Sequence, residues 1–212
     1  MVLGSDFWPV TLECGDLVLR PILRRDKREW SQVRQYNAEW LAPWEASNPQ
    51  PGGRLPSFGE MVHSLNQQAR QATALPWLIT ERRPSLPKPV LVGQLTVSSI
   101  VWGSAMMATL GYWVDRRCAG RGIAPTAVAM ATDHCFGVLG LHRMEINIRP
   151  ENAPSLRVVE KLGFRPECLR PRYLHINGEW ADHRSFALTA EEVPGGLLER
   201  WLREGDQSAK AP

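Results

Sequence analysis

The sequence lacks a long apolar run and is poor in cysteine. No window approaches the roughly 18–20 consecutive apolar residues of a membrane span, so we expect no membrane association. The four cysteines, Cys14, Cys118, Cys135 and Cys168, are widely spaced, form no C-x-x-C pair and have no histidine cluster nearby, so we expect no metal site. The first residues carry acids and lack a basic segment followed by an apolar run, which argues against a secretory signal. Together these absences predict a cytoplasmic protein with free thiols.

Neither sign of charge dominates the sequence. The 212 residues include 25 Lys and Arg and 22 Asp and Glu, for a net charge of +3. No block of like charges forms the basic stripe of a nucleic-acid binder, so we expect no direct contact with nucleic acid. The small basic excess favours an anionic small molecule as ligand. The length and a hydrophobic content of 43% suffice for one domain with a sizeable core and exclude disorder as the main state.

Hydrophobic periodicity and turn residues predict a mixed sheet with flanking helices. Ser57 and Glu60 fit a capping box, Asp26 is a candidate N-cap, and Asn177-Gly178 is typical of a hairpin turn. Because strands outnumber β-α-β units, the pattern predicts a single α/β or α+β domain. We expect strands over residues 17–20, 77–80, 90–101, 110–114, 144–148, 169–176 and 185–188, helices over 27–36, 57–72, 124–139, 155–162 and 197–203, a loop at 48–53 and a frayed tail at 205–212.

A glycine loop follows one predicted strand and precedes a predicted helix. Gly120 and Gly122 let backbone N–H groups approach a ligand closely, and the N-terminus of the helix adds unpaired donors and a positive dipole end. Arg116, Arg117 and Arg121 add positive charge. The loop therefore predicts a phosphate or pyrophosphate site. The alternative is a tight turn with solvated arginines.

Two common nucleotide-binding motifs do not fit this loop. A P-loop needs Lys followed by Ser or Thr after its second glycine, and neither follows Gly122. A dinucleotide fingerprint that begins at Gly120 needs Gly or Ala three residues after Gly122, where Pro125 stands.

The loop and the segments around it resemble the acetyl-CoA site of the GNAT N-acetyltransferase superfamily. The family loop Q/R-x-x-G-x-G/A matches residues 119–124 at Gly122 and Ala124, with Ala119 at the Q/R position, and matches 117–122 in a shifted register; the first register places the helix better. The sequences N-A-P-S at 152–155, E-K-L-G-F at 160–164 and Y-L-H-I-N-G-E-W at 173–180 are similar to RimJ/RimL-type ribosomal-protein N-acetyltransferases. N-A-E-W-L-A-P-W-E at 37–45 resembles the RimJ branch.

This resemblance implies a GNAT domain over residues 12–190 and a C-terminal helix and tail over 191–212. The expected fold is a single α/β (α+β) domain with a mixed, mostly antiparallel sheet of about seven strands, which splays where acetyl-CoA binds. The resemblance implies contacts between Asn152 and the pantetheine arm and between the N–H of Val114 and the same arm, and stabilisation of the acetyl carbonyl by backbone. The implied cofactor-binding residues are Trp113, Val114, Arg116, Arg117, Gly120, Arg121, Gly122, Ile123, Ala124, Pro125, Asn152 and Ser155.

The resemblance also implies catalytic roles. Ser155 lies near the sulfur of CoA and protonates the leaving thiolate as general acid. Helix capping by Asn152 and Ser155 is the alternative. Many family members carry a catalytic Tyr where Val159 stands, which increases the weight of Ser155.

The general base is left open by the sequence. Some RimL-type enzymes have a Glu base on the penultimate strand, and Leu174 holds that position here. Glu45 is one candidate, either as base or as a partner for the substrate amine, and a water chain is another. Glu145, Asp182 and His183 are the remaining candidates. The implied acceptor-binding residues are Trp40, Trp44, Glu45 and Tyr173.

The resemblance implies transfer of an acetyl group from acetyl-CoA to the N-terminal α-amine of a protein, with a ribosomal protein as acceptor. The amine attacks the thioester directly in a ternary complex, without metal or acyl-enzyme. We expect a monomer or a homodimer. Two alternatives remain: an acetyltransferase for a small amine, and a non-catalytic module that binds acyl-CoA.

Overall fold

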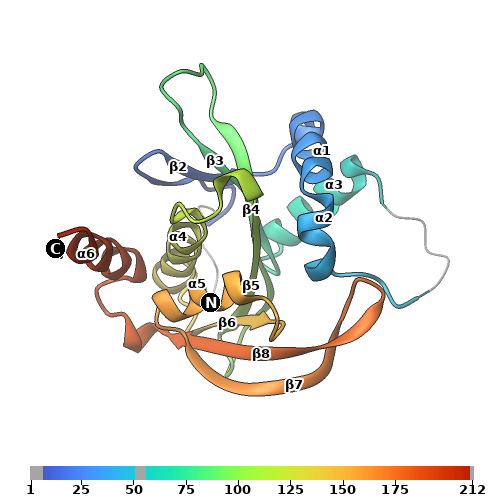
Figure 1. The fold of residues 1–212 in the computed structure, drawn as a ribbon. Helices are drawn as coiled ribbons and strands as arrows, with labels where there is room; N and C mark the ends of the chain where they lie inside the picture. Colours follow the sequence, from blue (N-terminus) through green and yellow to red (C-terminus); the bar gives the residue numbers. More distant parts are fainter. Residues whose placement is uncertain (1–6, 51–55, 211–212) are drawn as a thin grey trace.

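Eight strands and six α-helices make up the fold (Figure 1). The computed structural model describes residues 7–50 and 56–210, the last five of these without their side chains. The strands are β1 Leu12–Cys14, β2 Leu17–Pro21, β3 Leu75–Glu81, β4 Val90–Val101, β5 Met107–Val114, β6 Arg143–Ile148, β7 Arg165–Ile176 and β8 Glu179–Thr189. The α-helices are α1 Lys27–Tyr36, α2 Ala38–Leu41, α3 Phe58–Arg70, α4 Ile123–Gly137, α5 Ala153–Lys161 and α6 Leu197–Lys210, with 3-10 turns η1 Arg24–Asp26, η2 Ala42–Trp44, η3 Arg116–Cys118 and η4 Ala190–Glu192.

All strands belong to one sheet, in the order β1-β2-β3-β4-β5-β6-β8-β7. Every neighbouring pair is antiparallel except β5 and β6, which are parallel. The parallel pairing covers only Met107–Thr109 against Arg143–Glu145. Beyond Thr109, no strand among the described residues pairs with that edge of β5. The predicted mixed, mostly antiparallel sheet with a splay is therefore confirmed, with eight strands where about seven were expected.

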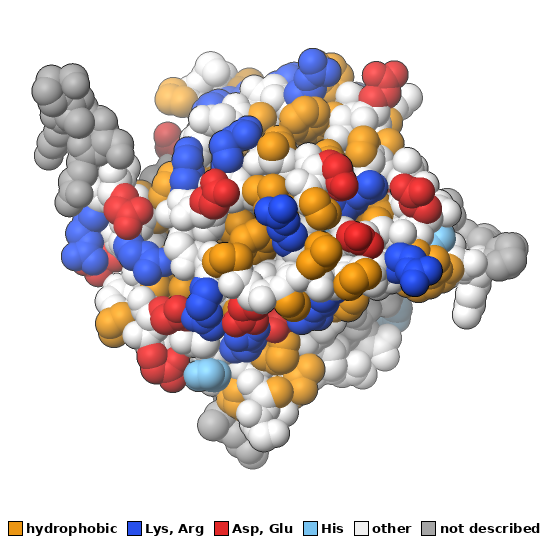
Figure 2. Space-filling model, turned by 60° about the horizontal axis from the view of Figure 1, so that its bottom comes forward, with side chains coloured by type: hydrophobic (Ala, Val, Ile, Leu, Met, Phe, Trp, Pro, Cys, Tyr) orange, Lys and Arg blue, Asp and Glu red, His pale blue; other side chains and the backbone are white. Residues whose placement is uncertain are grey.

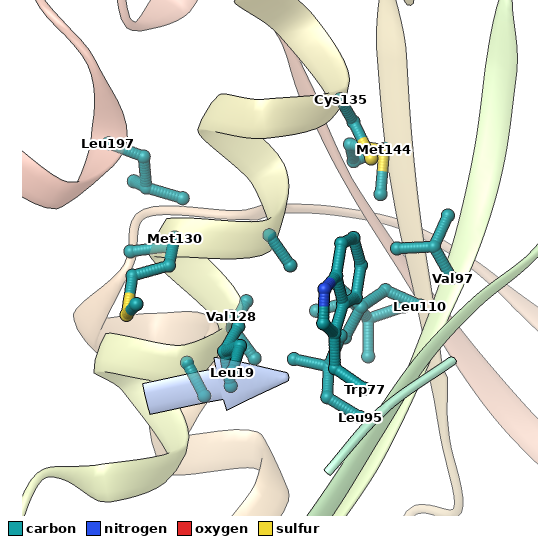
Figure 3. Close-up of a cluster of buried hydrophobic side chains, with 14 of the residues drawn as sticks. Leu19, Trp77, Leu95, Val97, Leu110, Val128, Met130, Cys135, Met144 and Leu197 are labelled. Carbon is teal, nitrogen blue, oxygen red and sulfur yellow. The ribbon is translucent and has the colours of Figure 1, made fainter. Parts of the chain in front are cut away.

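Helices cover both faces of the sheet. In Figure 1, α4 and α6 lie on one side of β3, β4 and β5, and α1, α2 and α3 lie on the other. The larger buried cluster lies under α4, where Trp77, Leu95 and Leu110 of the sheet face Val128 (Figure 3). A smaller cluster lies under α1 and α3 and includes Val33. Residues of α4 and α5 lie on one side of the splay, and residues of α2 lie on the other side.

The local sequence signals explain most boundaries. Ser57 and Glu60 form the predicted capping box at the start of α3, with the Ser57 hydroxyl accepting from the Glu60 N–H at 3.3 Å. The hairpin turn at Asn177-Gly178 joins β7 to β8, as predicted. Asp26 occupies the N-cap position of α1, but its carboxylate accepts from Arg20 and from the Leu23 N–H instead of capping that helix.

Several elements differ from the expectations, among them β7 and β8, which begin at Arg165 and Glu179 instead of near 169 and 185. The strand β1 and the one-turn helix α2 were not predicted, because neither is long enough to show a periodicity. The tail predicted at 205–212 is wrong as far as Lys210, because α6 continues to that residue. Residues 51–53 of the predicted loop and residues 211–212 lie outside the described residues.

The helix α6 packs on the domain through its N-terminal half. Leu197 is fully buried against α4, and the Leu197 and Leu198 N–H groups donate to the Asp133 carboxylate. The indole N–H of Trp201 donates to the Thr126 hydroxyl at 2.9 Å. The domain boundary at residue 190 stays a prediction.

Candidate active site

A cleft of about 690 Å³ opens where β5 leaves β6. One wall is the end of β5, from Gly111 to Val114, which lies beyond the last residue paired with β6. The start of α4 and one face of α5 form a second wall, and α2 with η2 closes the opposite side. The cleft therefore runs through the splay and connects both faces of the sheet.

The start of α4 offers backbone donors to this cleft. Gly122 is its N-cap with φ +78°, and Gly120 has φ +79°, backbone angles that side chains with a Cβ rarely adopt. Pro125 lies in the first turn of α4 and has no N–H, so Ile123 and Ala124 supply the N–H groups without a helical partner there. Gly120 and residues 122–125 all line the cleft. A 15-residue helix pointing its N-terminus into a cleft provides an anion site.

The three loop arginines do not line the cleft. Arg117 pairs with Asp115 and stacks on Tyr36, 4.2 Å from the ring centre. Arg121 pairs with Glu81. Burial favours a high pKa for the Glu81 carboxyl, but hydrogen bonds from Arg121 and Arg83 outweigh it and lower the pKa. The cofactor-binding roles of Arg117 and Arg121 stay predictions, and each guanidinium already has a carboxylate partner.

Arg116 is likewise outside the cleft. Its N–H donates to the Asn37 side-chain oxygen at 2.9 Å, and its guanidinium lies 6.0 Å from the centre of the Trp40 ring. Asn37 is fully buried, so this bond fixes the start of η3 to the beginning of α2. The loop that carries Gly120 and the helix that carries Trp40 are thus held together.

Asn152 and Ser155 begin α5, and both line the cleft. The Asn152 side-chain oxygen accepts from the Ser155 N–H at 3.1 Å, so the capping interpretation of Asn152 is confirmed. The Ser155 side chain is half-buried, and Val159 is fully buried in the core. The hydroxyl of Ser155 therefore lies at the positive end of the helix dipole, where a developing negative charge is stabilised.

The structure adds Tyr112, which the sequence interpretation did not assign to the site. Tyr112 lines the cleft from β5, and its hydroxyl is enclosed and has no hydrogen-bond partner within the part of the chain described. Burial raises the pKa of Tyr112 to about 12, and the nearby Ser155 hydroxyl partly opposes this rise. The alternation of side chains along the strand could have placed Tyr112 there, because Tyr112 lies on the same face of β5 as Leu110, the face that α4 covers.

The acceptor side of the cleft contains three of the four residues predicted for it: Trp40, Trp44 and Glu45. Arg34 pairs with the Glu45 carboxylate and lies against two rings, 5.6 Å from the centre of Trp30 and 5.3 Å from that of Trp113. Polar side chains of β4 complete this side; they are Gln94, Thr96 and Ser98, and none was predicted. The β4 side chains could be found only from the register of β4 against β5, and Arg34 only from the packing of α1 on the sheet.

The tip of the β7–β8 hairpin holds the segment after Trp44. Ala46 forms a bridge with Ile176, the Asn177 N–H donates to the Glu45 carbonyl at 2.8 Å, and the Ser47 N–H donates to the His175 carbonyl at 2.9 Å. Tyr173, the fourth predicted acceptor residue, does not line the cleft. It contacts His183 edge to face and lies under the Arg170 guanidinium. Its role stays a prediction.

Of the four side chains considered as general base, only Glu45 lines the cleft. Glu145 is buried and pairs with Arg143 and Arg170. Asp182 accepts from the Arg172 N–H. His183 is buried beside the Ala181 carbonyl, and burial lowers its pKa, so the imidazole is neutral near pH 7. No three His, Cys, Asp or Glu side chains among residues 7–50 and 56–205 come together as metal ligands would. None of the described helices has both the length and the apolarity to cross a bilayer.

Comparison with known proteins agrees with this geometry. The Acetyltransferase (GNAT) domain family matches residues 16–165. The solved structure of RimJ from Mycobacterium smegmatis in complex with CoA-disulfide superposes with a TM-score of 0.84 at 37% identity, covering 94% of this chain and 96% of that one. The [Ribosomal protein uS5]-alanine N-acetyltransferase of Escherichia coli (strain K12) is 28% identical over 187 residues, which are 88% of this chain and 94% of that protein.

A third relative matches over a shorter region. The probable N-acetyltransferase YjcK of Bacillus subtilis (strain 168) is 38% identical over 98 residues. These residues are 46% of this chain and 54% of that protein. The chain therefore belongs to the GNAT acetyltransferase family and is an acetyl-CoA-dependent N-acetyltransferase of the RimJ/RimL type.

Proposed function

We propose that this enzyme acetylates the N-terminal α-amine of a protein, and that the acceptor is a ribosomal protein. One relative supports the acceptor class, because the [Ribosomal protein uS5]-alanine N-acetyltransferase aligns with 88% of this chain. The aligned length includes the acceptor side of the cleft as well as the glycine loop. A ribosomal acceptor places the reaction in the cytoplasm.

The charge of the cleft carries this proposal. Glu45 is the one acidic side chain among the described residues that line it, and it already has Arg34 as a partner. Arg157 and Lys161 also line the cleft. The cleft thus offers one carboxylate to one cationic amine, whereas a polyamine would find no second acid among the described residues that line it. The acceptor therefore presents a single amine to the site.

The cleft also suggests how acetyl-CoA lies. The pyrophosphate would bind the N–H groups at the start of α4, and the pantetheine arm would follow the open edge of β5. The Asp115 N–H donates to Val92 of β4, so by strand alternation the Val114 N–H points to the opposite, unpaired edge. Asn152 and Ser155 then face the thioester end of the arm.

The reaction requires positioning more than activation, because a thioester already reacts with amines. The neutral amine enters between Trp40, Trp44 and Glu45 and attacks the acetyl carbon. The carbon–sulfur bond breaks, and Ser155 gives its proton to the leaving thiolate as general acid. Glu45 either binds the ammonium before attack or accepts its proton.

Thiol release from acetyl-CoA tests this proposal. The acceptors are peptides that begin with Ala and carry a free or a blocked N-terminus, with spermidine as the small-amine control. We expect release with the free α-amine alone. We also expect Glu45→Gln to raise the KM for the peptide about tenfold while the KM for acetyl-CoA changes little, a loss consistent with one charge-assisted contact. Release with spermidine and not with peptides would replace the proposal by a small-amine enzyme. Binding of CoA without release from any acceptor would favour a binding module.

A further inference from the structure

The amide side chain of Gln94 lines the cleft from β4 and has no role in the proposed mechanism. Its oxygen accepts a hydrogen bond from the indole N–H of Trp30 at 2.9 Å. An indole N–H can only donate, so the oxygen of the amide must face Trp30 and the NH2 group must point away from that bond. Trp30 does not line the cleft and packs against Phe58, with 5.2 Å between the ring centres. Gln94 is therefore held in one orientation, and its NH2 group is the part of the amide that remains for a ligand in the cleft.

This NH2 group has no hydrogen-bond partner among the described residues, although Gln94 is only half-buried. Thr96 and Ser98 follow at alternate positions of β4, so they share a face of the sheet with Gln94, and they line the cleft as well. Gly111 pairs with Thr96 across the ladder and has nothing within 4 Å of its Cβ position. The sheet surface beside Gln94 is therefore both polar and open.

The side of the sheet on which Gln94 lies identifies the ligand that it can meet. Leu95, the next residue, belongs to the larger buried cluster under α4, so Gln94 points to the opposite face from the glycine loop. Gln94 pairs in register with Trp113. The Trp113 ring lies against Arg34, which is the partner of Glu45. The ligand that reaches Gln94 is thus the one that reaches Glu45, which in the proposed function is the acceptor.

We infer that the NH2 group of Gln94 donates a hydrogen bond to the first backbone carbonyl oxygen of the acceptor, so that the site recognises a peptide as well as an amine. This inference rests on the proposed function, because it takes the acceptor to be a protein N-terminus. In such a substrate the first carbonyl oxygen is close to the reacting nitrogen, and it accepts hydrogen bonds but cannot donate them. Contacts at two points, with Glu45 for the amine and Gln94 for the carbonyl, orient the nitrogen toward the thioester. A polyamine has no carbonyl oxygen for the second contact.

A change of one atom in the acceptor tests this contact. Ala-Ala amide is compared with its thioamide analogue, in which sulfur, the weaker hydrogen-bond acceptor, replaces the first carbonyl oxygen. With the wild type, we expect the sulfur to lower kcat/KM about tenfold, as for the loss of one hydrogen bond in a closed site. With Gln94→Glu, we expect the same exchange to change kcat/KM by less than about twofold, because an ionised Glu cannot donate to either atom.

The variant Gln94→Glu separates a donor from a structural residue. Its carboxylate can still accept from the Trp30 N–H, so a role limited to that bond predicts activity like that of the wild type. We expect kcat/KM for Ala-Ala amide to fall at least about tenfold and the KM for acetyl-CoA to change less than about threefold. Gln67→Glu is the matched control, because it makes the same change of charge at an exposed position of α3 outside the cleft.

Three results would overturn the inference. The first is an equal effect of the sulfur in the wild type and in Gln94→Glu, which leaves the proposed function standing when both peptides are acetylated. The second is a raised KM for acetyl-CoA with unchanged discrimination between the peptides, which would assign the amide to CoA. The third is an enzyme–CoA complex that neither acetylates nor binds Ala-Ala amide, and this result would overturn the proposed function too.

Two measurements cover the case in which Gln94→Glu does not fold, which loss of the CoA-induced rise in Tm would reveal. Gln94→Met keeps the length of the side chain without any donor, and we expect it to lose the discrimination between the two peptides in the same way. Calorimetry with the wild-type complex with CoA needs no variant and should show about tenfold tighter binding of the oxygen peptide. Equal affinities for the two peptides would rule out the contact.

Discussion

Gly93 offers a direct test of the sheet that supports the cleft. It lies in β4, opposite Val114 in the register with β5. A Cβ built on Gly93 would lie 2.3 Å from the Trp113 carbonyl oxygen, and also 3.2 Å from Ile79 Cδ1 and from Val114 Cα. The nearest atom is backbone and cannot rotate away. The variant Gly93→Ala must therefore move β5 away from β4 by about 1 Å to restore ordinary contact distances.

The cost of this movement has two parts. Overpacking of this kind costs about 1–3 kcal/mol. The shift also weakens the hydrogen bond from the Asp115 N–H to the Val92 carbonyl, at about 1 kcal/mol. The sum is about 2–4 kcal/mol, which for a domain of this length lowers Tm by roughly 4–16 °C. Because Val114 moves as well, we expect weaker binding of CoA.

Thermal unfolding and CoA titration of Gly93→Ala measure both effects. Gly59→Ala is the matched control, because Gly59 lies in α3 with nothing within 4 Å of its Cβ position. Ala is the better helix former by about 0.5–1 kcal/mol, so Tm of the control should stay level or rise. If Gly93→Ala unfolds within about 2 °C of the wild type and binds CoA normally, the close approach of Gly93 to Trp113 does not exist in solution.

Two further predictions concern the glycine loop and the outer face of the sheet. Gly122→Glu should abolish CoA binding by placing an anion at the N-terminus of α4, whereas Gly122→Ala carries only the backbone strain of a positive φ, about 1–2 kcal/mol, and should keep measurable binding. Normal CoA affinity of Gly122→Glu, measured by titration, would move the phosphate site elsewhere. On the outer strands, acidic and basic side chains lie among apolar ones (Figure 2). Glu167 belongs to β7, and hydrogen bonds from Arg143 and then from Arg165 lower its pKa from 4.5 to about 2. The lowered pKa stabilises the fold above pH 4.5, and this contribution disappears as the pH falls toward 2. In urea unfolding, Glu167→Gln should therefore lower the free energy of unfolding by about 1 kcal/mol at pH 7 and by progressively less below pH 4.5. A cost that is constant between pH 7 and pH 3.5, or that also occurs with the exposed Glu199→Gln, would contradict this assignment.

The sequence could predict elements whose stability is local. The helix α1 occupies residues 27–36 as expected, because Trp30 and Val33 recur at helical spacing and both face the sheet. The strand β4 covers the predicted 90–101, where β-branched residues are frequent. Tertiary contacts hold the part of α6 that was predicted: Asp133 of α4 binds its first N–H groups, and Thr126 accepts from Trp201.

The candidate site divides in the same way. The glycines and the Asn152 cap are local signals, and the structure places them at the cleft. The partner of Arg121 is Glu81, forty residues earlier in the chain, and no local pattern connects them. The sequence therefore predicted an Arg121 side chain available to a phosphate, whereas in the structure it pairs with the Glu81 carboxylate. Tyr112 was interpreted only as a strand residue, because an unpartnered hydroxyl can be recognised only when both walls of the cleft are known.

The bonds that hold the segment after Trp44 affect how this enzyme can diverge. The contacts from Asn177 to Glu45 and from Ser47 to His175 join backbone to backbone, so they do not depend on the side chains at positions 44 and 45. Single substitutions at these positions can therefore alter the acceptor while the loop keeps its course. The CoA end tolerates fewer substitutions, because Gly122 adopts a positive φ that residues with a Cβ rarely adopt. Paralogues of this enzyme should therefore all use acetyl-CoA as the acetyl donor but differ in the amine that they acetylate.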